Sequence, residues 1–109
     1  MLTRETAINI ATKFVLDCIK SGVNIEKAII FGSFAKNQQK EFSDIDIALV
    51  SGIFDNNFLN NNQLTSKINI KYPDIEAHHF NSTYFNAGDP FIEEITKTGF
   101  EINLNSAVE

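Results

Sequence analysis

Two acidic side chains stand two residues apart in the segment Ser43-Asp44-Ile45-Asp46-Ile47. Residues at i and i+2 of a β-strand project from the same face, with Cα atoms about 6.5–7 Å apart. The Asp44 and Asp46 carboxylates can therefore close around one cation. Oxygen is the ligand atom that Mg²⁺ prefers, and protein-bound Mg²⁺ usually bridges to substrate phosphates. The pair predicts metal-assisted phosphate chemistry, although an Asp-x-Asp pair alone is common on solvated strands.

A glycine–serine pair precedes the acidic segment. Ala28-Ile29-Ile30-Phe31 is a short apolar run that predicts a buried strand ending at Gly32. Gly32 lets the backbone approach a ligand closely, because it has no Cβ. Ser33 offers a hydroxyl and an N–H group, and a helix starting there would favour phosphate at its N-terminus. Because sequential strands are usually neighbours, we expect this turn to lie beside the aspartates. Metal-bound triphosphate is the simplest ligand that suits both the anion-binding turn and the cation-binding carboxylates.

A third carboxylate, Glu76, lies near the start of a predicted strand over residues 75–80. It can lie beside Asp44 and Asp46 and complete a two-metal site, whose ions are about 3.5–4 Å apart. Carboxylates about 4 Å apart repel by about 4 kcal/mol per pair at an effective dielectric constant of about 20. We therefore expect the metal-free site to raise a carboxyl pKa or to destabilise the fold, and a divalent metal to relieve the repulsion.

Three further polar residues stand near these positions. Lys36 follows the Gly-Ser turn, where reaching a phosphate oxygen and simple solvent exposure are equally good interpretations. His78 and His79 are adjacent in a strand, so they point to opposite faces and do not share a metal ion locally. His78 shares the Glu76 face and is a candidate for the active cleft. Bonding of His78 to backbone or water is the preferred interpretation.

The first half of the chain contains the elements that must position this site. Residues 3–21 predict an amphipathic helix, with Thr3 as its cap and Gly22 at its end. Cys18 falls on the apolar stripe and is expected to be a buried structural thiol. Residues 33–40 predict a short helix or turn. Residues 44–50 predict a strand that carries its carboxylates on one face and its branched apolar side chains, Ile45, Ile47 and Leu49, on the other.

The second half predicts a third strand between helical or irregular segments. Five asparagines among residues 56–62 indicate a loop, followed by a short helix that packs Leu64 and Ile68. Tyr72-Pro73-Asp74 is typical of a turn. Asp89-Pro90 predicts the start of a last helix, Gly99 its end, and Phe91 and Ile95 its buried side. Residues 100–104 form a possible short terminal strand. The order predicts one small α/β domain over residues 1–109.

Bulk properties exclude several classes of protein. The 109 residues carry a formal net charge of −5, which disfavours direct binding to nucleic-acid phosphates. No apolar run approaches the ~20 residues of a membrane helix, and residues 1–6 do not resemble a signal peptide. The single Cys18 cannot form an internal disulfide. A cytoplasmic protein without a membrane partner is therefore expected.

The segment from Phe31-Gly32-Ser33-Phe34-Ala35-Lys36 to Ser43-Asp44-Ile45-Asp46-Ile47-Ala48-Leu49-Val50 closely resembles the minimal nucleotidyltransferases (MNT domains) of the DNA polymerase β superfamily. The resemblance is tightest over residues 28–50 and continues more loosely through residues 73–80 and 89–99. It implies a mixed three-stranded sheet flanked by helices, the nucleotidyltransferase fold. It also implies transfer of a nucleoside monophosphate, AMP from ATP, to an acceptor, with release of pyrophosphate.

The resemblance assigns roles to residues of this chain. It implies that Gly32 and Ser33 bind the phosphates, that Asp44 and Asp46 bind the two Mg²⁺ ions, and that Glu76 is the third catalytic acid. Glu76 either holds the second metal ion or accepts the proton of the acceptor hydroxyl. The chain departs from the family pattern at two of its positions. Asn37 stands where the family often has glycine, but asparagine tolerates the left-handed conformation. Glu76 stands where the third acid is commonly aspartate.

The same resemblance suggests a partner and leaves alternatives open. Stand-alone MNT proteins are often paired with a HEPN-domain toxin, which they neutralise by binding, by adenylylation or by both. A binding module that has lost turnover is therefore the second hypothesis. A metal-dependent glycosyltransferase, which also uses Asp-x-Asp, is a third and is disfavoured by the short chain and the Gly-Ser turn. An apolar patch for another protein is expected among four phenylalanines that are not clearly placed in the core: Phe54, Phe58, Phe80 and Phe85.

Overall fold

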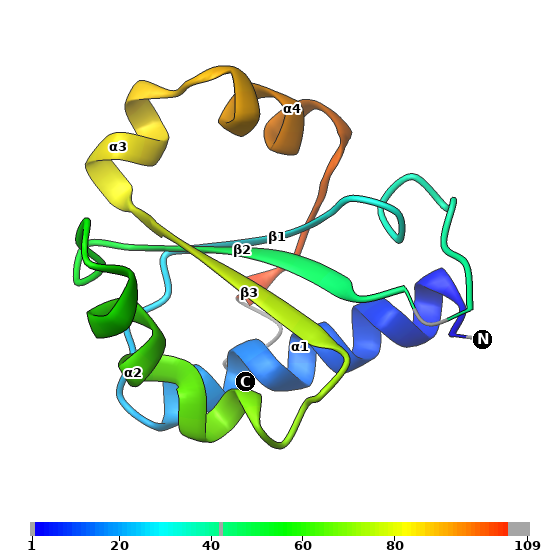
Figure 1. Ribbon diagram of the computed structural model, residues 1–109, viewed down its shortest axis with the longest axis horizontal. Coiled ribbons are helices and arrows are strands. Elements are labelled where there is room, and N and C mark those ends of the chain that lie inside the picture. The colour runs from blue at the N-terminus through cyan, green and yellow to red at the C-terminus, as the bar shows by residue number, and fades with distance from the viewer. Residues whose placement is uncertain (1, 42, 105–109) are drawn as a thin grey trace.

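A four-stranded sheet lies between two pairs of helices in the computed structural model, which describes residues 2–41 and 43–104 (Figure 1). The strand order is β3-β2-β1-β4. Strand β1 (Lys27–Phe31) is antiparallel to β2 (Ile45–Ser51), which is parallel to β3 (Ile75–Asn81). This arrangement confirms the predicted mixed α/β fold.

The expected number of three strands is wrong, because β4 (Phe100–Glu101) adds a fourth. It pairs antiparallel with β1, and the Ile102 N–H extends the pairing by donating to the Ala28 carbonyl at 2.8 Å. Residues 100–104 do contain the strand considered from the sequence, but only two of them have strand geometry. This short β4 forms one edge of the sheet, and β3 forms the other.

Helix α1 (Arg4–Lys20) confirms the first predicted helix. The Thr3 side chain accepts a hydrogen bond from the Thr6 N–H, as an N-cap residue does. The predicted stripe faces the sheet, and its fully buried members are Ala7, Ala11, Phe14, Val15 and Cys18. Burial raises the pKa of the Cys18 thiol to about 12, and the charge of Asp17 adds to this effect. The thiol is therefore structural, as predicted.

Helix α2 (Phe58–Asn69) begins inside the segment that was predicted to be a loop. Asn57 caps it by accepting from the Asn60 N–H at 3.1 Å, so the asparagine-rich stretch starts a helix. The predicted packing of Leu64 is also wrong, because 41% of Leu64 is exposed. The helix buries Asn61 and Thr65 instead, while Ile68 packs against the core as expected.

Helices α3 (Ser82–Ala87) and α4 (Pro90–Thr98) cover the face of the sheet opposite α1 and α2 (Figure 1). Asp89 caps α4 and Pro90 is its first residue, as predicted. The prediction that Phe91 is buried is wrong: 47% of Phe91 is exposed, and Ile92 is buried beside Ile95. No helix in residues 2–41 and 43–104 combines the length and the apolar character needed to cross a membrane.

Two separate apolar clusters follow from the alternation of side chains along the strands. The face of β2 toward α1 carries Ile45, Ile47 and Leu49, which pack in one cluster with Phe14 of α1 and Ile30 of β1. The opposite face carries Ala48 and Val50, packed against α3 and α4 through Phe85, Ile92 and Ile95. Asp46 belongs to this second face, so the predicted division of β2 into an apolar and a carboxylate-bearing face is confirmed.

Candidate functional site

Three side chains from two adjacent parallel strands meet at one end of the sheet. Asp46 on β2 is the register partner of Glu76 on β3, and His78 follows two residues later on the same face. One potential ligand atom from each of the three lies within 4.8 Å of the others. His78 Nε2 lies 3.2 Å from Asp46 Oδ1. We call these three residues the acidic cluster.

The neighbouring Asp46 carboxylate controls the titration of Glu76. The pKa of Glu76 is raised, first by a hydrogen bond with Asp46, then by partial burial and then by the negative charge of Asp46. Asp44 also raises it, while the nearby His78 acts in the opposite direction. The expectation that the metal-free site raises a carboxyl pKa is therefore confirmed. The cluster favours an added positive charge, and two carboxylates with an imidazole are a donor set that fits a divalent cation.

The end of β1 approaches the cluster through a residue that must be glycine. Gly32 has a φ angle of +76°, and a Cβ built on it would lie 2.7 Å from Asp46 Oδ2. A side chain at this position would therefore displace the carboxylate. The approach of Gly32 to a ligand stays a prediction, and the group that a side chain there would meet is Asp46.

The segment after Gly32 consists of turns and contains no helix. The Lys36 N–H donates to the Gly32 carbonyl at 3.2 Å, and the buried Phe34 holds the segment to the core. A phosphate site at a helix N-terminus is therefore absent from this part of the chain, which leaves individual N–H groups and the Ser33 hydroxyl as donors. Asn37 has a φ angle of +56°, which confirms that asparagine accepts the left-handed conformation here.

The remaining predicted residues lie further from the cluster. Asp44 is exposed just before β2 and is not among the three residues whose ligand atoms come together, although its charge acts on Glu76. Ser33 is half-buried in the turn. Lys36 forms an exposed ion pair with Glu94 of α4, at 3.1 Å between Nζ and Oε1. The structure thus brings Asp46 and Glu76 together beside Gly32 and leaves Asp44 and Lys36 at the periphery.

His78 makes a contact that differs from the predicted one. The preferred interpretation, bonding to backbone or water, is wrong because the ring bonds to Asp46. The signal was present: His78 stands two residues after Glu76 and shares its face. His79 points to the other face, where its Nε2 lies 2.8 Å from Thr65 Oγ1. Burial and the charge of His78 lower the pKa of His79 to about 4, and its half-buried ring packs edge-on against Phe54 with centroids 4.9 Å apart.

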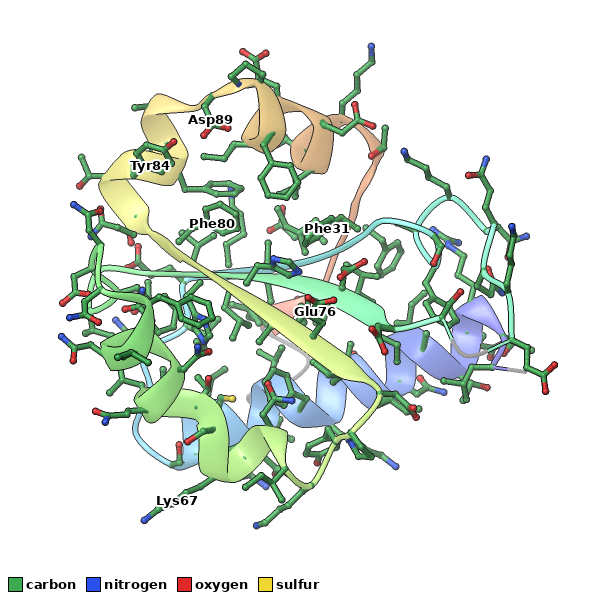
Figure 2. The ribbon with its side chains drawn as sticks, in the orientation of Figure 1. Phe31, Lys67, Glu76, Phe80, Tyr84 and Asp89 are labelled. Carbon is green, nitrogen blue, oxygen red and sulfur yellow. The ribbon has the colours of Figure 1, made fainter. Side chains whose placement is uncertain are left out.

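Aromatic rings form a wall between the cluster and the α3/α4 pair. The Phe31 ring lies edge-on to His78, with centroids 4.9 Å apart, and edge-on to Phe91 at 5.6 Å. Phe80 extends the wall toward Phe85 at 5.5 Å. Figure 2 shows Phe31 and Phe80 in the layer between the sheet and these helices. The contact with Phe31 restricts the orientation of the His78 ring.

The four phenylalanines expected to form an exposed patch do not behave alike. Phe54 and Phe85 are buried, at 1% and 5% exposure, and Phe80 is half-buried. Phe58 is 70% exposed at the start of α2. Of the four candidates for an apolar patch, Phe54 and Phe85 are excluded by their burial, and Phe58 is the one that is largely exposed.

Solved structures with the same fold include two whose names bear on this site. One is a protein from Sulfolobus solfataricus assigned as a nucleotidyltransferase, which matches with a TM-score of 0.68 and 21% identity over 90% of this chain and 80% of the other. The second is a toxin–antitoxin complex with AMP-PNP, with a TM-score of 0.60 and 14% identity over 88% of this chain and 77% of the other. Because both sequence identities are low, these structural matches show a shared fold and nothing more.

Among proteins with curated functions, no sequence matches this chain significantly. The family model for polymerase beta, nucleotidyltransferase matches residues 14–106, which include β1, β2, β3 and every residue of the acidic cluster. The match covers most of the chain. The chain therefore belongs to the polymerase beta nucleotidyltransferase family.

Proposed function

We propose that this protein is a metal-dependent nucleotidyltransferase that transfers AMP from ATP to an acceptor and releases pyrophosphate. The observation that carries the proposal is the convergence of Asp46, Glu76 and His78 within 4.8 Å, beside a glycine at which an added Cβ would lie 2.7 Å from Asp46 Oδ2. Carboxylates that repel one another persist in a fold when a cation offsets the repulsion.

Each residue has a defined task in this proposal. Asp46 and Glu76 hold two Mg²⁺ ions, with Asp44 as the third carboxylate at the mouth of the site. When bound, these ions neutralise the triphosphate and the leaving pyrophosphate. The Gly32 backbone and the Ser33 hydroxyl bind phosphate oxygens. Lys36 must leave Glu94 to reach the same phosphates, because the two form an ion pair at 3.1 Å.

The reaction is an in-line displacement at the α-phosphorus. The acceptor oxygen forms a bond to that phosphorus as the bond from the α-phosphorus to the bridging oxygen breaks, and the electron pair leaves with pyrophosphate. The acceptor proton passes to Glu76 if Glu76 is not a metal ligand, and to solvent if it is; Asp46 raises the pKa of Glu76 above its ordinary value. His78 bonds to Asp46 Oδ1 and keeps that carboxylate in place.

The acceptor in this proposal is a protein hydroxyl, and the partner is a toxin with a HEPN domain. Two observations support this choice. A toxin–antitoxin complex that contains AMP-PNP shares the fold of this chain over 88% of its length. The domain itself is small, so a partner must supply most of the surface that selects the acceptor.

A second function has its own support. Asp44 lies outside the acidic cluster and Lys36 is paired with Glu94, so the chain is also a candidate for a catalytically weak MNT-fold module that neutralises its partner by binding alone. In that case the metal site stabilises the fold without turnover.

Label transfer from [α-³²P]ATP, with Mg²⁺ and the co-expressed partner, separates the two functions. We expect the wild type to label the partner and Asp46→Asn and Glu76→Gln to abolish labelling while the complex still forms. Glu41→Gln removes an exposed carboxylate outside the cluster and is the matched control, with labelling retained. A complex that forms without any labelling would support the binding module. Full labelling by Asp46→Asn would refute the assignment of this site.

A further inference from the structure

Strand β3 forms an outer edge of the sheet, and part of its backbone has no partner. The Ile45 N–H donates to the Asp74 carbonyl at 2.7 Å, and Ile45 is the register partner of Ile75. In a parallel ladder alternate residues direct both backbone groups to the neighbouring strand. Glu76 and His78 therefore turn their N–H and C=O groups toward β2, whereas Ile75, Ala77 and His79 turn theirs outward.

The outward groups of Ile75 are already satisfied. Its N–H donates to the Tyr72 carbonyl at 3.0 Å, and its carbonyl accepts from Asn69 Nδ2 at 3.0 Å. For Ala77 and His79, no hydrogen bond to these outward groups is found in residues 2–41 and 43–104. Two consecutive outward positions thus offer two N–H donors and two carbonyl acceptors.

A groove follows this edge. It consists of two adjoining hollows of about 490 and 280 Å³, which share Phe58, Asn61, His79 and Phe80 in their walls. Every residue of β3 from Ile75 to Asn81 lines one of them. Because successive side chains of a strand point to opposite faces, an unbroken run of lining residues means that the groove runs along the edge. We call it the β3 edge groove.

The walls of the β3 edge groove suit a polypeptide. Phe58 at the start of α2 is 70% exposed and lines both hollows, and Tyr84 of α3 is 52% exposed and lines the smaller one, so the groove offers two rings. Asn61 and Asn62 lie along the α2 side. No Lys or Arg is among the described residues that line it, which disfavours a nucleic-acid strand as the occupant.

The edge also lacks the features that normally prevent strand pairing. Exposed edge strands are usually protected by lysine, proline, a bulge or a covering segment. The sequence of β3, Ile75-Glu76-Ala77-His78-His79-Phe80-Asn81, contains no lysine or proline. Its single charged carboxylate is Glu76, which is turned toward Asp46 in the acidic cluster. The edge therefore remains open to an extended chain.

Glu76 and His78 line the groove and also belong to the acidic cluster. We propose that the β3 edge groove binds an extended segment of the acceptor polypeptide by strand addition, which brings an acceptor Ser, Thr or Tyr hydroxyl beside Glu76. The inference rests on the proposed transferase function and names the class of its acceptor. Main-chain hydrogen bonds to Ala77 and His79 supply affinity, and the rings of Phe58 and Tyr84 contact the side chains of the segment.

Amide hydrogen exchange of the ¹⁵N-labelled full chain tests this directly. The probe is the heptapeptide Lys-Thr-Tyr-Thr-Tyr-Thr-Lys at millimolar concentration, because main-chain pairing does not depend on sequence and its lysines suit an acidic protein. We expect the amides of Ala77 and His79 to gain at least about tenfold protection, and those of Glu76 and His78, already bonded to β2, to change little. The same peptide with N-methylated threonines is the control and should give no protection.

Phe58→Asp and Leu59→Asp form a matched pair of variants. The two side chains are 70% and 71% exposed on the same helix, but only Phe58 lines the groove. We expect Phe58→Asp to weaken binding of the fluorescein-labelled heptapeptide at least about tenfold in an anisotropy titration, and Leu59→Asp to change it less than about twofold. Equal effects of the two variants would overturn the groove assignment.

Calorimetry with Mg²⁺ and AMP-PNP on the same samples separates this inference from the proposed function. Nucleotide binding without new protection at Ala77 and His79 overturns the inference and leaves the transferase intact. Protection at both amides without nucleotide binding supports the groove and refutes the transferase. Protection that rises with protein concentration and needs no peptide would assign the edge to a second copy of the chain and overturn the acceptor proposal.

Discussion

Replacing Gly32 with alanine tests whether the site depends on the close approach between the end of β1 and Asp46. The backbone of Gly32 is left-handed, with φ at +76°, and this conformation costs an L-residue about 1–2 kcal/mol. The new Cβ would also lie 2.7 Å from Asp46 Oδ2, so the carboxylate must rotate away. That rotation breaks the 3.2 Å contact between Asp46 Oδ1 and His78 Nε2.

Gly22→Ala isolates the backbone part of this effect. Gly22 follows α1 with φ at +104°, and a Cβ there would meet no atom within 4 Å. Both variants are expected to lose about 1–2 kcal/mol of unfolding free energy. For a domain of this size, each kcal/mol lowers Tm by about 4–8 °C. Only Gly32→Ala is expected to weaken Mg²⁺·AMP-PNP binding in calorimetry, by at least about tenfold, or about 1.4 kcal/mol.

Two outcomes of measuring Gly32→Ala beside Gly22→Ala decide whether the contact with Asp46 matters. If Gly32→Ala binds Mg²⁺·AMP-PNP as tightly as the wild type and as Gly22→Ala does, the contact with Asp46 has no role in ligand binding. If Gly32→Ala loses no more stability than Gly22→Ala but loses binding, the carboxylate has moved without further cost to the fold, as we expect.

Three further predictions concern titration and reactivity. Because Asp46 raises the pKa of Glu76, ionised Glu76 opposes folding near neutral pH. In scanning fluorimetry, Glu76→Gln should therefore raise Tm of the metal-free protein at pH 7 but not below about pH 4. The same variant should abolish the Tm increase that Mg²⁺ causes in the wild type. Burial lowers the pKa of His79 from an ordinary 6.5 to about 4, so as pH falls the unfolded chain binds a proton before the folded chain does. Urea titrations should therefore show the free energy of unfolding falling by up to about 3 kcal/mol between pH 6.5 and pH 4. His79→Gln should remove this pH-dependent loss. Cys18 is fully buried with a pKa of about 12, so a thiol reagent at pH 8 should label it only as fast as the protein unfolds. Labelling that is faster than unfolding would contradict the core position of Cys18.

The division of β2 into two faces could be predicted from the sequence because burial demands it. Ile45, Ile47 and Leu49 must face a core, so Asp46 must face the other way, and a slip of one residue would bury the carboxylate. The same alternation placed Glu76 and His78 on one face of β3. What the sequence does not contain is the register between the strands, which sets His78 within reach of Asp46 rather than of backbone or water.

The errors in the helices have a common cause in tertiary contacts. Asn61 is buried because its side chain bonds to both backbone groups of Asp55, at 2.9 and 2.8 Å, and so fixes the chain before α2. A polar residue is then the better core residue at this position, and Leu64 is left exposed. In α4 both Phe91 and Ile92 are apolar, and spacing alone does not decide which one joins Ile95 in the core.

Several local costs to stability coincide at one end of β2 and β3. Gly32 has a left-handed backbone conformation next to the Asp46 carboxylate. Asp46 also raises the pKa of Glu76, first through a hydrogen bond and further through its charge, and Ala77 leaves backbone groups unpaired along the edge. A fold selected for stability alone would replace the carboxylates and protect the edge strand. A divalent cation removes the first conflict and an added strand removes the second, so one ternary complex of metal, nucleotide and polypeptide accounts for both. Mg²⁺·AMP-PNP and the heptapeptide should therefore raise Tm together by more than either does alone, because each binds only the folded state.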